Sequence, residues 1–434
     1  MLSPTFPRVD LPHLADVPIP PMLRVRLAHP KAEPVADIGA AVDEALARSR
    51  RLQDLHTGAR VAVAVGSRGI AHIPDVVAAA VHHLKQRGFA PFIVPAMGSH
   101  GGATAEGQAS VLAHLGVTEA SVGAPVRATM ETLEYGATLH GIPSRFDKNA
   151  AEADAVLCIN RVKSHTSFDR PIESGLTKLI AVGLGKQIGA SNVHRLGPRG
   201  YTEVLPALAR IAIDHAPIAY GIALVEDANK QLTVIEGVEP DDFAATDQRL
   251  LKLAKSLVAR LPFERIDALS VEWIGKEISG AGMDPAVVGR VGIRSVPDPG
   301  KPFVNKLAVL GVTEDSYGSA VGLGNADYTT MKVANHIDLL PMYMNAITAA
   351  GTESARIPAV LPDDRTVIKA MVATCWRADP ENARLCQIRS TLYLNEILVS
   401  PSLFADIEGR PDVERLSDAE PLHFFDDGEL LTRV

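Results

Sequence analysis

The sequence predicts an α/β protein with two domains, and three observations lead to this prediction. The chain has 434 residues, which is more than one hydrophobic core ordinarily serves. In its first half, β-branched runs alternate with segments of helical period, as in a parallel sheet covered by helices. Its last third mixes strand-like runs with little helical pattern. We therefore expect an N-terminal domain, 1–270, with a largely parallel, helix-covered sheet, and a smaller α+β domain, 271–434.

The first half repeats a strand, loop and helix unit. The run RVAVAVGSRGI is β-branched and ends in glycine, and the helical segment after it has Pro74 near its start and Gly88 at its end. The next unit has Thr104 as a plausible N-cap and Gly116 closing the helix. The predicted elements are a strand in 60–70, a helix over 73–88, a strand and helix in 89–116, a strand over 153–160 and a helix over 201–216.

Polar loops follow three of these strands at equivalent positions. They are GSRG with Arg68, GSHGG with His100 and NRVKSH with His165. In a parallel sheet, ligands bind just beyond the carboxyl ends of the strands. The same placement after three strands therefore predicts a binding site formed by these loops.

The rest of the chain is less regular. A helix is expected over 241–263 from its apolar period, then a strand over 266–275 and a turn-rich segment, 276–290. Beyond the boundary we expect strands at 306–312, 366–374 and 386–400, and one helix near 325–337.

Composition and charge exclude several classes of protein. The formal net charge is -8, and no cluster of Lys and Arg has the interleaved aromatics that a nucleic-acid surface needs. Apolar runs are shorter than the roughly 20 residues of a membrane span, and the N-terminus lacks a secretion signal, so we expect a cytoplasmic protein. Three scattered cysteines, Cys158, Cys375 and Cys386, make neither a disulfide framework nor a thiolate metal site.

The glycine-rich run VGLGKQIG invites a nucleotide-binding interpretation that its residues contradict. A phosphate-binding P-loop needs glycine where Ile180 stands and Ser or Thr where Gln187 stands. Gly183, Gly185 and Gly189 give GxGxxxG rather than the dinucleotide pattern GxGxxG, and no clear strand precedes them. A nicotinamide-dependent oxidoreductase therefore stays only as a less favoured alternative.

The GSHGG loop has two interpretations. It can be a simple glycine turn before a helix. Alternatively, the backbone of Gly98, Ser99 and Gly101 and the helix amides bind a phosphate or carboxylate, while His100 projects into the pocket. Histidine suits proton transfer at neutral pH because its ordinary pKa is near 6.5.

Lys178 and His194 lie in an apolar, glycine-rich stretch. Lys178 can extend its ammonium group to the surface, or it can be buried, where its amine becomes nucleophilic toward a carbonyl-type group. One imidazole is a poor metal site, because protein sites usually supply three or four ligands. The two residues make sense together only if another molecule provides the missing ligands.

GSHGG, RVKSHTSF, ESGLTK and His194, in this order, resemble the nickel-dependent lactate racemase superfamily of 2-hydroxy-acid racemases and epimerases. The likeness spans most of the chain and is strongest over 155–197. It implies a nickel-pincer nucleotide: a pyridinium-3,5-dithiocarboxylate-type mononucleotide attached covalently to a lysine, which holds nickel together with one histidine. It also implies an active site between the two domains, a small 2-hydroxy acid as substrate, and cofactor-biosynthesis proteins as partners.

The resemblance assigns roles residue by residue. Lys178 corresponds to the attachment lysine and His194 to the nickel ligand, while His100 and His165 correspond to two acid/base histidines on opposite faces of the substrate. Two bases serve a racemase because each enantiomer presents its hydroxyl differently. The cofactor-binding set implied is Lys178, Arg68, Gly98, Ser99, Gly101, Ser174 and Gly175.

The sequence departs from the family pattern around the substrate. Different residues, Val65, Ser67 and Gly69, surround Arg68, which is expected to position substrate or cofactor. His165 and Lys178 are 13 residues apart, a longer gap than expected. The usual Gln and Lys substrate contacts have no evident counterpart, and Lys276 and Arg290 are the candidates to replace them at the substrate carboxylate.

These departures favour a hydroxy acid other than lactate itself. The alternative is a protein of the same fold that binds a hydroxy acid or nucleotide without racemising it. That protein would have Lys178 pointing away from the pocket or paired with an acid.

Overall fold

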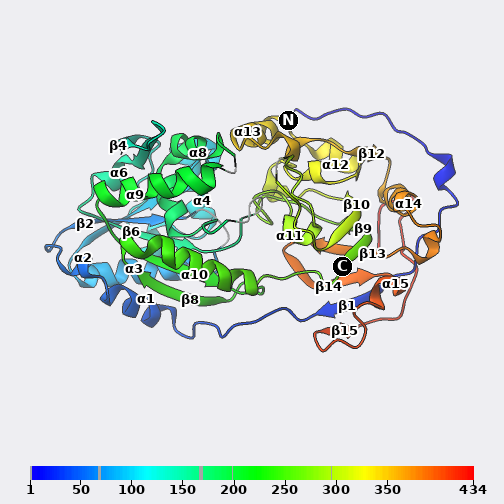
Figure 1. Ribbon diagram of the computed structural model, residues 1–434, viewed down its shortest axis with the longest axis horizontal. Coiled ribbons are helices and arrows are strands. Elements are labelled where there is room, and N and C mark those ends of the chain that lie inside the picture. The colour runs from blue at the N-terminus through cyan, green and yellow to red at the C-terminus, as the bar shows by residue number, and fades with distance from the viewer. Residues whose placement is uncertain (1, 67–69, 166–169, 198, 295) are drawn as a thin grey trace. The chain divides into compact units, whose positions relative to one another are not determined.

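The structure is a computed structural model that describes residues 2–66, 70–165, 170–197, 199–294 and 296–434. The chain divides into two compact units (Figure 1). The continuous unit is Pro30–Val258, and the split unit combines Met1–His29 with Ala259–Val434. This division differs from the predicted one, 1–270 and 271–434, because the first residues and the segment after Val258 belong to the second unit.

The continuous unit is built on a five-stranded sheet in the order β3-β2-β6-β7-β8. The first four strands in this order are parallel and β8 is antiparallel to β7, so the sheet is largely parallel, as predicted. The strands are β2 (Arg60–Val65), β3 (Ala90–Pro95), β6 (Ala155–Arg161), β7 (Ile218–Glu226) and β8 (Leu232–Val238), with a separate hairpin of β4 (Thr132–Ala137) and β5 (Pro143–Asp147).

Helices α1 (Ile38–Ala47), α2 (Arg50–Gln53), α3 (Ile73–Gln86), α4 (Ala105–His114), α5 (Glu119–Val122), α6 (Lys148–Ala151), α7 (Leu176–Lys178), α8 (Lys186–His194), α9 (Leu205–His215) and α10 (Phe243–Ser256) complete this unit. The predicted helix starts and ends are confirmed where local signals were strong. Thr104 caps α4 by accepting the N–H of Gly107, and Gly116 turns the chain at φ +80°.

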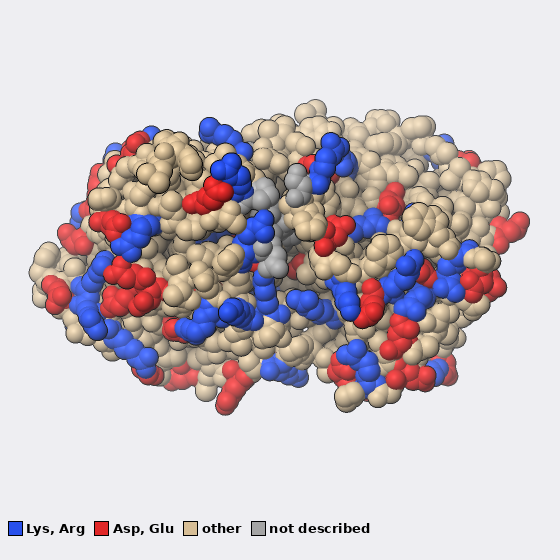
Figure 2. All heavy atoms as spheres, viewed as in Figure 1, with Lys and Arg blue, Asp and Glu red and all other residues tan. Residues whose placement is uncertain are grey.

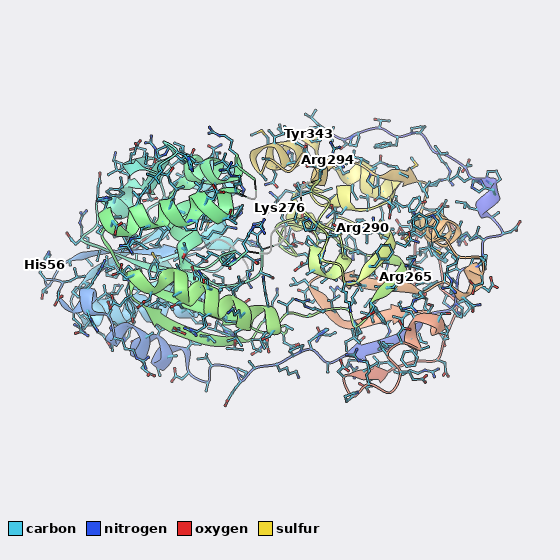
Figure 3. The ribbon with its side chains drawn as sticks, in the orientation of Figure 1. His56, Arg265, Lys276, Arg290, Arg294 and Tyr343 are labelled. Carbon is cyan, nitrogen blue, oxygen red and sulfur yellow. The ribbon has the colours of Figure 1, made fainter. Side chains whose placement is uncertain are left out.

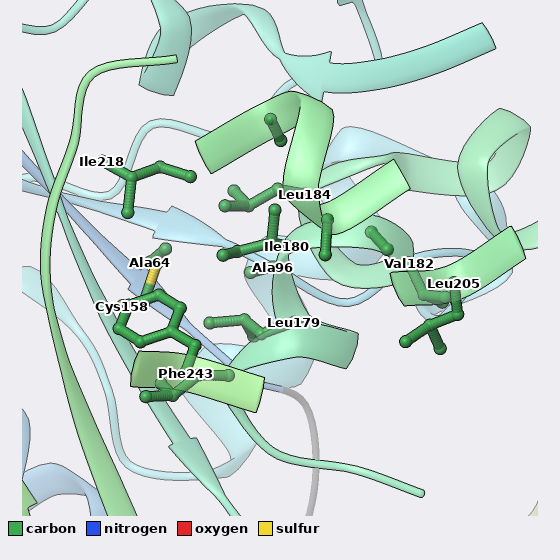
Figure 4. Close-up of a cluster of buried hydrophobic side chains, with 14 of the residues drawn as sticks. Ala64, Ala96, Cys158, Leu179, Ile180, Val182, Leu184, Leu205, Ile218 and Phe243 are labelled. Atoms are coloured by element: carbon green, nitrogen blue, oxygen red, sulfur yellow. The ribbon is translucent and has the colours of Figure 1, made fainter. Parts of the chain in front are cut away.

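An unusual helical stretch joins α7 to α8. Leu179–Leu184 forms a π-helical turn, and Lys186 then adopts a left-handed backbone with φ +54°. Leu179, Ile180 and Leu184 are buried in the core that covers one face of the sheet (Figure 4). Burial of these apolar side chains fixes the stretch between Lys178, the last residue of α7, and α8, the helix that ends at His194.

The split unit contains an eight-stranded mixed sheet in the order β12-β11-β10-β9-β13-β14-β1-β15. Strands β12, β11, β10, β9 and β13 pair in parallel, whereas β14, β1 and β15 pair antiparallel, so the sheet of this unit is mixed. The strands are β1 (Leu23–Leu27), β9 (Arg265–Val271), β10 (Phe303–Val309), β11 (Tyr328–Thr330), β12 (Ala359–Leu361), β13 (Leu385–Ser390), β14 (Tyr393–Val399) and β15 (Val413–Arg415).

One predicted strand of this unit is wrong. Residues 366–374 lie within helix α14 (Asp364–Thr374), which Asp363 caps by accepting the N–H of Thr366. The apolar run is buried along one helical face rather than in the sheet. The other helices of the unit are α11 (Pro285–Val288), α12 (Met331–His336), α13 (Leu339–Thr348) and α15 (Pro401–Phe404).

Among the described residues, no helix combines the length and apolar character that crossing a bilayer requires. On the face shown in Figure 2, basic and acidic side chains are interspersed. Charged side chains of the protein form many ion pairs, such as Arg210 with Asp214 and Asp241.

Candidate active site

Three strands of the continuous unit end together at one edge of its sheet. Val65 of β2 is in register with Pro95 of β3 and with Ile159 of β6. The loops after β3 and β6 therefore begin at the same edge of the sheet, on either side of β2, as the sequence predicts for a parallel sheet. Arg68, in the loop after β2, lies outside the described residues.

The GSHGG loop packs on the π-helical turn between Lys178 and His194. The N–H of Gly98 donates to the carbonyl of Gly183 at 3.0 Å. Gly98 has φ +62°, and a Cβ there would lie only 3.2 Å from the carbonyl oxygen of Val182. Glycine at this position thus lets the loop that carries His100 approach the lysine and histidine segment closely.

Glu173 holds the loop that carries His165. Its carboxylate is buried, accepts the N–H of His165 at 2.6 Å, and forms a 2.6 Å ion pair with Lys255 of α10. Ser174 Oγ accepts the N–H of Lys163 at 2.6 Å, a second link across the same loop. Between His165 and Lys178, two side chains, those of Glu173 and Ser174, therefore hold the backbone N–H groups of His165 and Lys163.

Asp247 anchors the start of α7. Its buried carboxylate accepts the backbone N–H groups of Leu176 at 3.0 Å and Thr177 at 2.8 Å, and burial raises the pKa of Asp247 to about 6. Gly175 has φ +90°, and a Cβ there would overlap the carboxylate of Asp247. This close approach sets the position of Lys178, which is one turn further along.

The ring of Tyr201 brings three predicted residues together. Its centroid lies 4.9 Å from that of His165 and 5.7 Å from that of His194, and Lys178 Nζ is 5.0 Å from it. Its hydroxyl is 3.3 Å from Nδ1 of His194. Residues up to 29 positions apart in the chain, from His165 to His194, therefore surround one buried aromatic ring.

Tyr201 itself was not predicted as a site residue. It stands seven residues after His194, in a different helical segment, and this short distance in the chain is the only local signal that could have suggested it. The signal alone is weak, because a buried tyrosine is ordinarily part of a core.

Both histidines beside Tyr201 favour their neutral forms. Burial, assisted by the nearby Lys178 charge, lowers the pKa of His194 to about 4 and holds the pKa of His165 well below its usual 6.5. Burial also raises the pKa of the Tyr201 hydroxyl, which stays protonated. At neutral pH each imidazole therefore keeps a nitrogen lone pair, available to bind a metal or to accept a proton.

Comparison with known proteins identifies no family for the chain. No family model matches it, and no curated protein matches it. Among solved structures it is similar to the lactate racemase apoprotein from Thermoanaerobacterium thermosaccharolyticum, with a TM-score of 0.49 and 11% identity over 85% of this chain and 98% of that one. A similarity at this level assigns no function, which depends on the residues of this chain.

The predicted substrate-binding residues Lys276 and Arg290 belong to the split unit (Figure 3). The guanidinium of Arg290 donates to the carbonyls of Val304, Asn305 and Asn325, and it pairs with Asp327 at 2.9 Å. These contacts give Arg290 a structural role within its own unit. The backbone N–H of Lys276 donates to Ser316 Oγ at 2.8 Å. The side chain of Lys276 is half-buried.

The glycines of VGLGKQIG do not form a dinucleotide-binding turn. Gly183 lies inside the π-helical turn, and Gly189 lies inside α8, whereas the dinucleotide motif joins a strand to a helix. The geometry thus gives no support to the nicotinamide-dependent alternative.

Within the described ranges, no group of three His, Cys, Asp or Glu side chains could hold a metal ion. A metal bound at His194 would therefore need donors beyond the side chains of these ranges, for which a bound molecule is one source. His194 fits that requirement, because it is neutral and lies beside the Lys178 amine that could anchor such a molecule.

Proposed function

We propose that this protein is a racemase or epimerase of a 2-hydroxy acid that works with a nickel-pincer nucleotide attached to Lys178. The observation that supports it best is the gathering of Lys178, His165 and His194 around Tyr201. The family resemblance of the sequence motifs gave these three residues separate roles in one site. Their convergence is the arrangement that those roles require.

In this proposal Lys178 carries the nucleotide and His194 supplies the protein ligand to nickel. The carbonyl of Glu173 lies 3.4 Å from Lys178 Nζ and orients the amine toward the Tyr201 ring. When bound, the nucleotide provides a hydride acceptor for the C2–H of the substrate. Ser174 and Gly175, which precede Lys178, keep their proposed place in the cofactor-binding set, together with the loop Gly98, Ser99 and Gly101.

His165 is proposed as one of the two acid/base groups. Its depressed pKa makes it a neutral imidazole, which can accept the proton of the substrate hydroxyl. Glu173 fixes the backbone of His165 through the 2.6 Å hydrogen bond to its N–H. For the opposite enantiomer, His100 on the GSHGG loop is proposed to take the same role.

An anionic substrate suits the charge around His165. Lys163 is close enough to lower the pKa of this histidine, so its positive charge would stabilise a carboxylate in the same space once the Lys178 amine carries the nucleotide. Arg68 and Lys276 remain proposed contacts to substrate or cofactor. We propose that the substrate is a 2-hydroxy acid other than lactate, since the departures from the family pattern fall among these residues.

The test uses protein produced together with cofactor-assembly enzymes. Intact-mass and peptide mass spectrometry should find an added mass on Lys178, metal analysis should find nickel, and chiral chromatography should show inversion of one member of a 2-hydroxy-acid panel. Lys178→Ala should lose all three signals, whereas Lys252→Ala, at an exposed lysine of α10, should keep them. Unmodified Lys178 in protein made with an active assembly system would refute the proposal.

A binding protein without catalysis is the second candidate. It requires no covalent group on Lys178, so Lys178→Ala would leave hydroxy-acid or nucleotide affinity unchanged. Calorimetric titration of the wild type and of this variant separates the two functions, because the racemase proposal predicts loss of cofactor attachment in the variant.

A further inference from the structure

A buried polar network lies behind the GSHGG loop and is not part of the site described above. It consists of Lys186 on α8, Gln108 on α4 and Asp147 at the end of β5, and all three side chains are fully buried. Buried charges are costly unless they are paired and hydrogen-bonded. A network of this kind in an otherwise apolar core therefore calls for a functional explanation.

The ammonium group of Lys186 has three polar contacts. Nζ donates to Gln108 Oε1 at 3.0 Å and to the carbonyl oxygen of Pro95 at 2.5 Å. It also forms an ion pair with Asp147, with Nζ 2.9 Å from Oδ2. Lys186 also holds a left-handed backbone at φ +54°, which is costly for any residue but glycine.

Lys186 dictates which way the amide of Gln108 faces. Because an ammonium group can only donate, the oxygen Oε1 must point toward Lys186, and the NH₂ group must point away from it. That NH₂ group donates to the carbonyl of Gly98 at 2.9 Å and approaches the carbonyl of His100 at 3.4 Å. The network therefore ends on the backbone of the loop that carries His100.

Backbone hydrogen bonds also hold the loop, including the one from His100 N–H to the carbonyl of Met97 at 3.2 Å. The loop nevertheless contains Gly98, Gly101 and Gly102, all with positive φ, and glycine gives the backbone more freedom than any other residue. A catalytic side chain on such a loop needs support to stay in a productive geometry, and an error of about 1 Å can cost on the order of a hundredfold in rate.

We propose that Gln108 and Lys186 are positioning residues for His100. Lys186, neutralised by Asp147, fixes the orientation of the Gln108 amide, and Gln108 fixes the carbonyls on both sides of Ser99. The inference rests on the proposed function in one respect only, namely that His100 moves a proton there. The restraint on the loop is a property of the chain itself and can be measured without catalysis.

Two substitutions of Gln108 separate positioning from simple stability. Gln108→Glu keeps an acceptor for Lys186 but removes the donor to the loop, and Gln108→Met removes both. In ¹⁵N-histidine-labelled protein, the imidazole signals of His100, assigned with His100→Asn, should broaden or split in both variants. The double variant Lys186→Met with Asp147→Asn should do the same, because Gln108 is then free to turn over. Gln248→Met, at an exposed glutamine of α10, is the matched control and should leave the signals unchanged.

In active holoenzyme, Gln108→Glu should lower kcat about tenfold or more with KM changed less than about threefold, and its melting temperature should stay near that of the wild type. If Gln108→Glu lowers kcat only together with a lower melting temperature, the network is merely structural and the proposal is overturned. Unchanged His100 signals in folded Gln108→Glu overturn it as well. If Gln108→Met fails to fold, Gln108→Glu decides. Should the wild type prove inactive on every hydroxy acid, the proposed function fails, while the His100 signals still decide the positioning role.

Discussion

The hydroxyl of Tyr201 lies 3.3 Å from Nδ1 of His194, and this contact bears on how His194 can bind a metal. When Nδ1–H donates to the phenolic oxygen, Nε2 is left with a free lone pair directed away from Tyr201. Hydrogen bonds of this kind orient ligating histidines in many metal sites. In the proposed metal-bound form, Nδ1–H would donate to the phenolic oxygen, which gives Tyr201 two proposed functions. Its ring contacts the three site residues, and its hydroxyl favours the tautomer of His194 with Nε2 free for the metal.

Tyr201→Phe tests the second function alone, because it keeps the ring and removes the hydroxyl. We expect attachment at Lys178 to persist but nickel affinity to fall on the order of tenfold to a hundredfold. Metal analysis after dialysis against a chelator gives the measurement. Tyr393→Phe, at a tyrosine of β14 in the split unit, is the control. Wild-type nickel retention in Tyr201→Phe would contradict the tautomer argument.

Gly175→Ala should destabilise the protein and displace Lys178. The new Cβ would combine a positive φ with overlap on the Asp247 carboxylate, so we expect a loss of about 3 kcal/mol in the free energy of unfolding. Gly409→Ala is a matched control, since Gly409 also has a positive φ, +80°, but open space around its Cβ. That variant should lose only about 1 kcal/mol, measured by urea denaturation. If the two variants lose equal free energy of unfolding, the folded protein relieves the overlap with Asp247 without losing stability, which contradicts the prediction.

Glu173→Gln should weaken the loop that carries His165. The substitution removes the charge from a buried ion pair with Lys255, and we expect a loss of about 2 kcal/mol in stability together with lower activity. The pair of Glu131 and Lys148 has the same 2.6 Å separation but is exposed, so Glu131→Gln should cost clearly less stability than Glu173→Gln. Similar unfolding curves for the two variants would contradict the role given to Glu173.

The raised pKa of Asp247 predicts that the stability of the protein depends on pH. Its folded-state pKa of about 6 lies above the ordinary value of 3.8, so the folded protein holds this proton more tightly than the unfolded chain does. The resulting stabilisation is complete below pH 3.8 and is lost as the pH rises to about 6. The stability difference between wild type and Asp247→Asn should therefore change by on the order of 2 kcal/mol between pH 4 and pH 7. Parallel curves in urea denaturation would rule this out.

Local signals predicted much of the continuous unit. Strands β2, β3 and β6, helices α3 and α4, and the cap at Thr104 follow from side-chain period and end signals, which act over a few residues. The common edge where the loops begin follows from the parallel sheet. The convergence of Lys178, His165 and His194 was expected from the family resemblance rather than from spacing.

The features that the sequence did not predict depend on distant contacts. The apolar run at 366–374 looks like a strand because it contains Val367, Ile368 and Val372, and only the Asp363 cap and burial on one face show a helix. Tyr201 and Gln108 acquire their importance from partners that no local pattern can identify. Strand β1 belongs to a sheet whose other strands lie more than 200 residues away in the chain.

That pairing of β1 has a consequence for biosynthesis. Leu23 pairs with Val399 of β14, so this strand must wait for nearly the whole chain to be translated before it can join its sheet. Pro30–Val258, in contrast, leaves the ribosome as one uninterrupted segment that contains every strand of its own sheet. Domains generally fold as units during synthesis, N-terminal first. We therefore expect the part of the protein that holds His100, His165, Lys178 and His194 to be folded while β1 still has no partner.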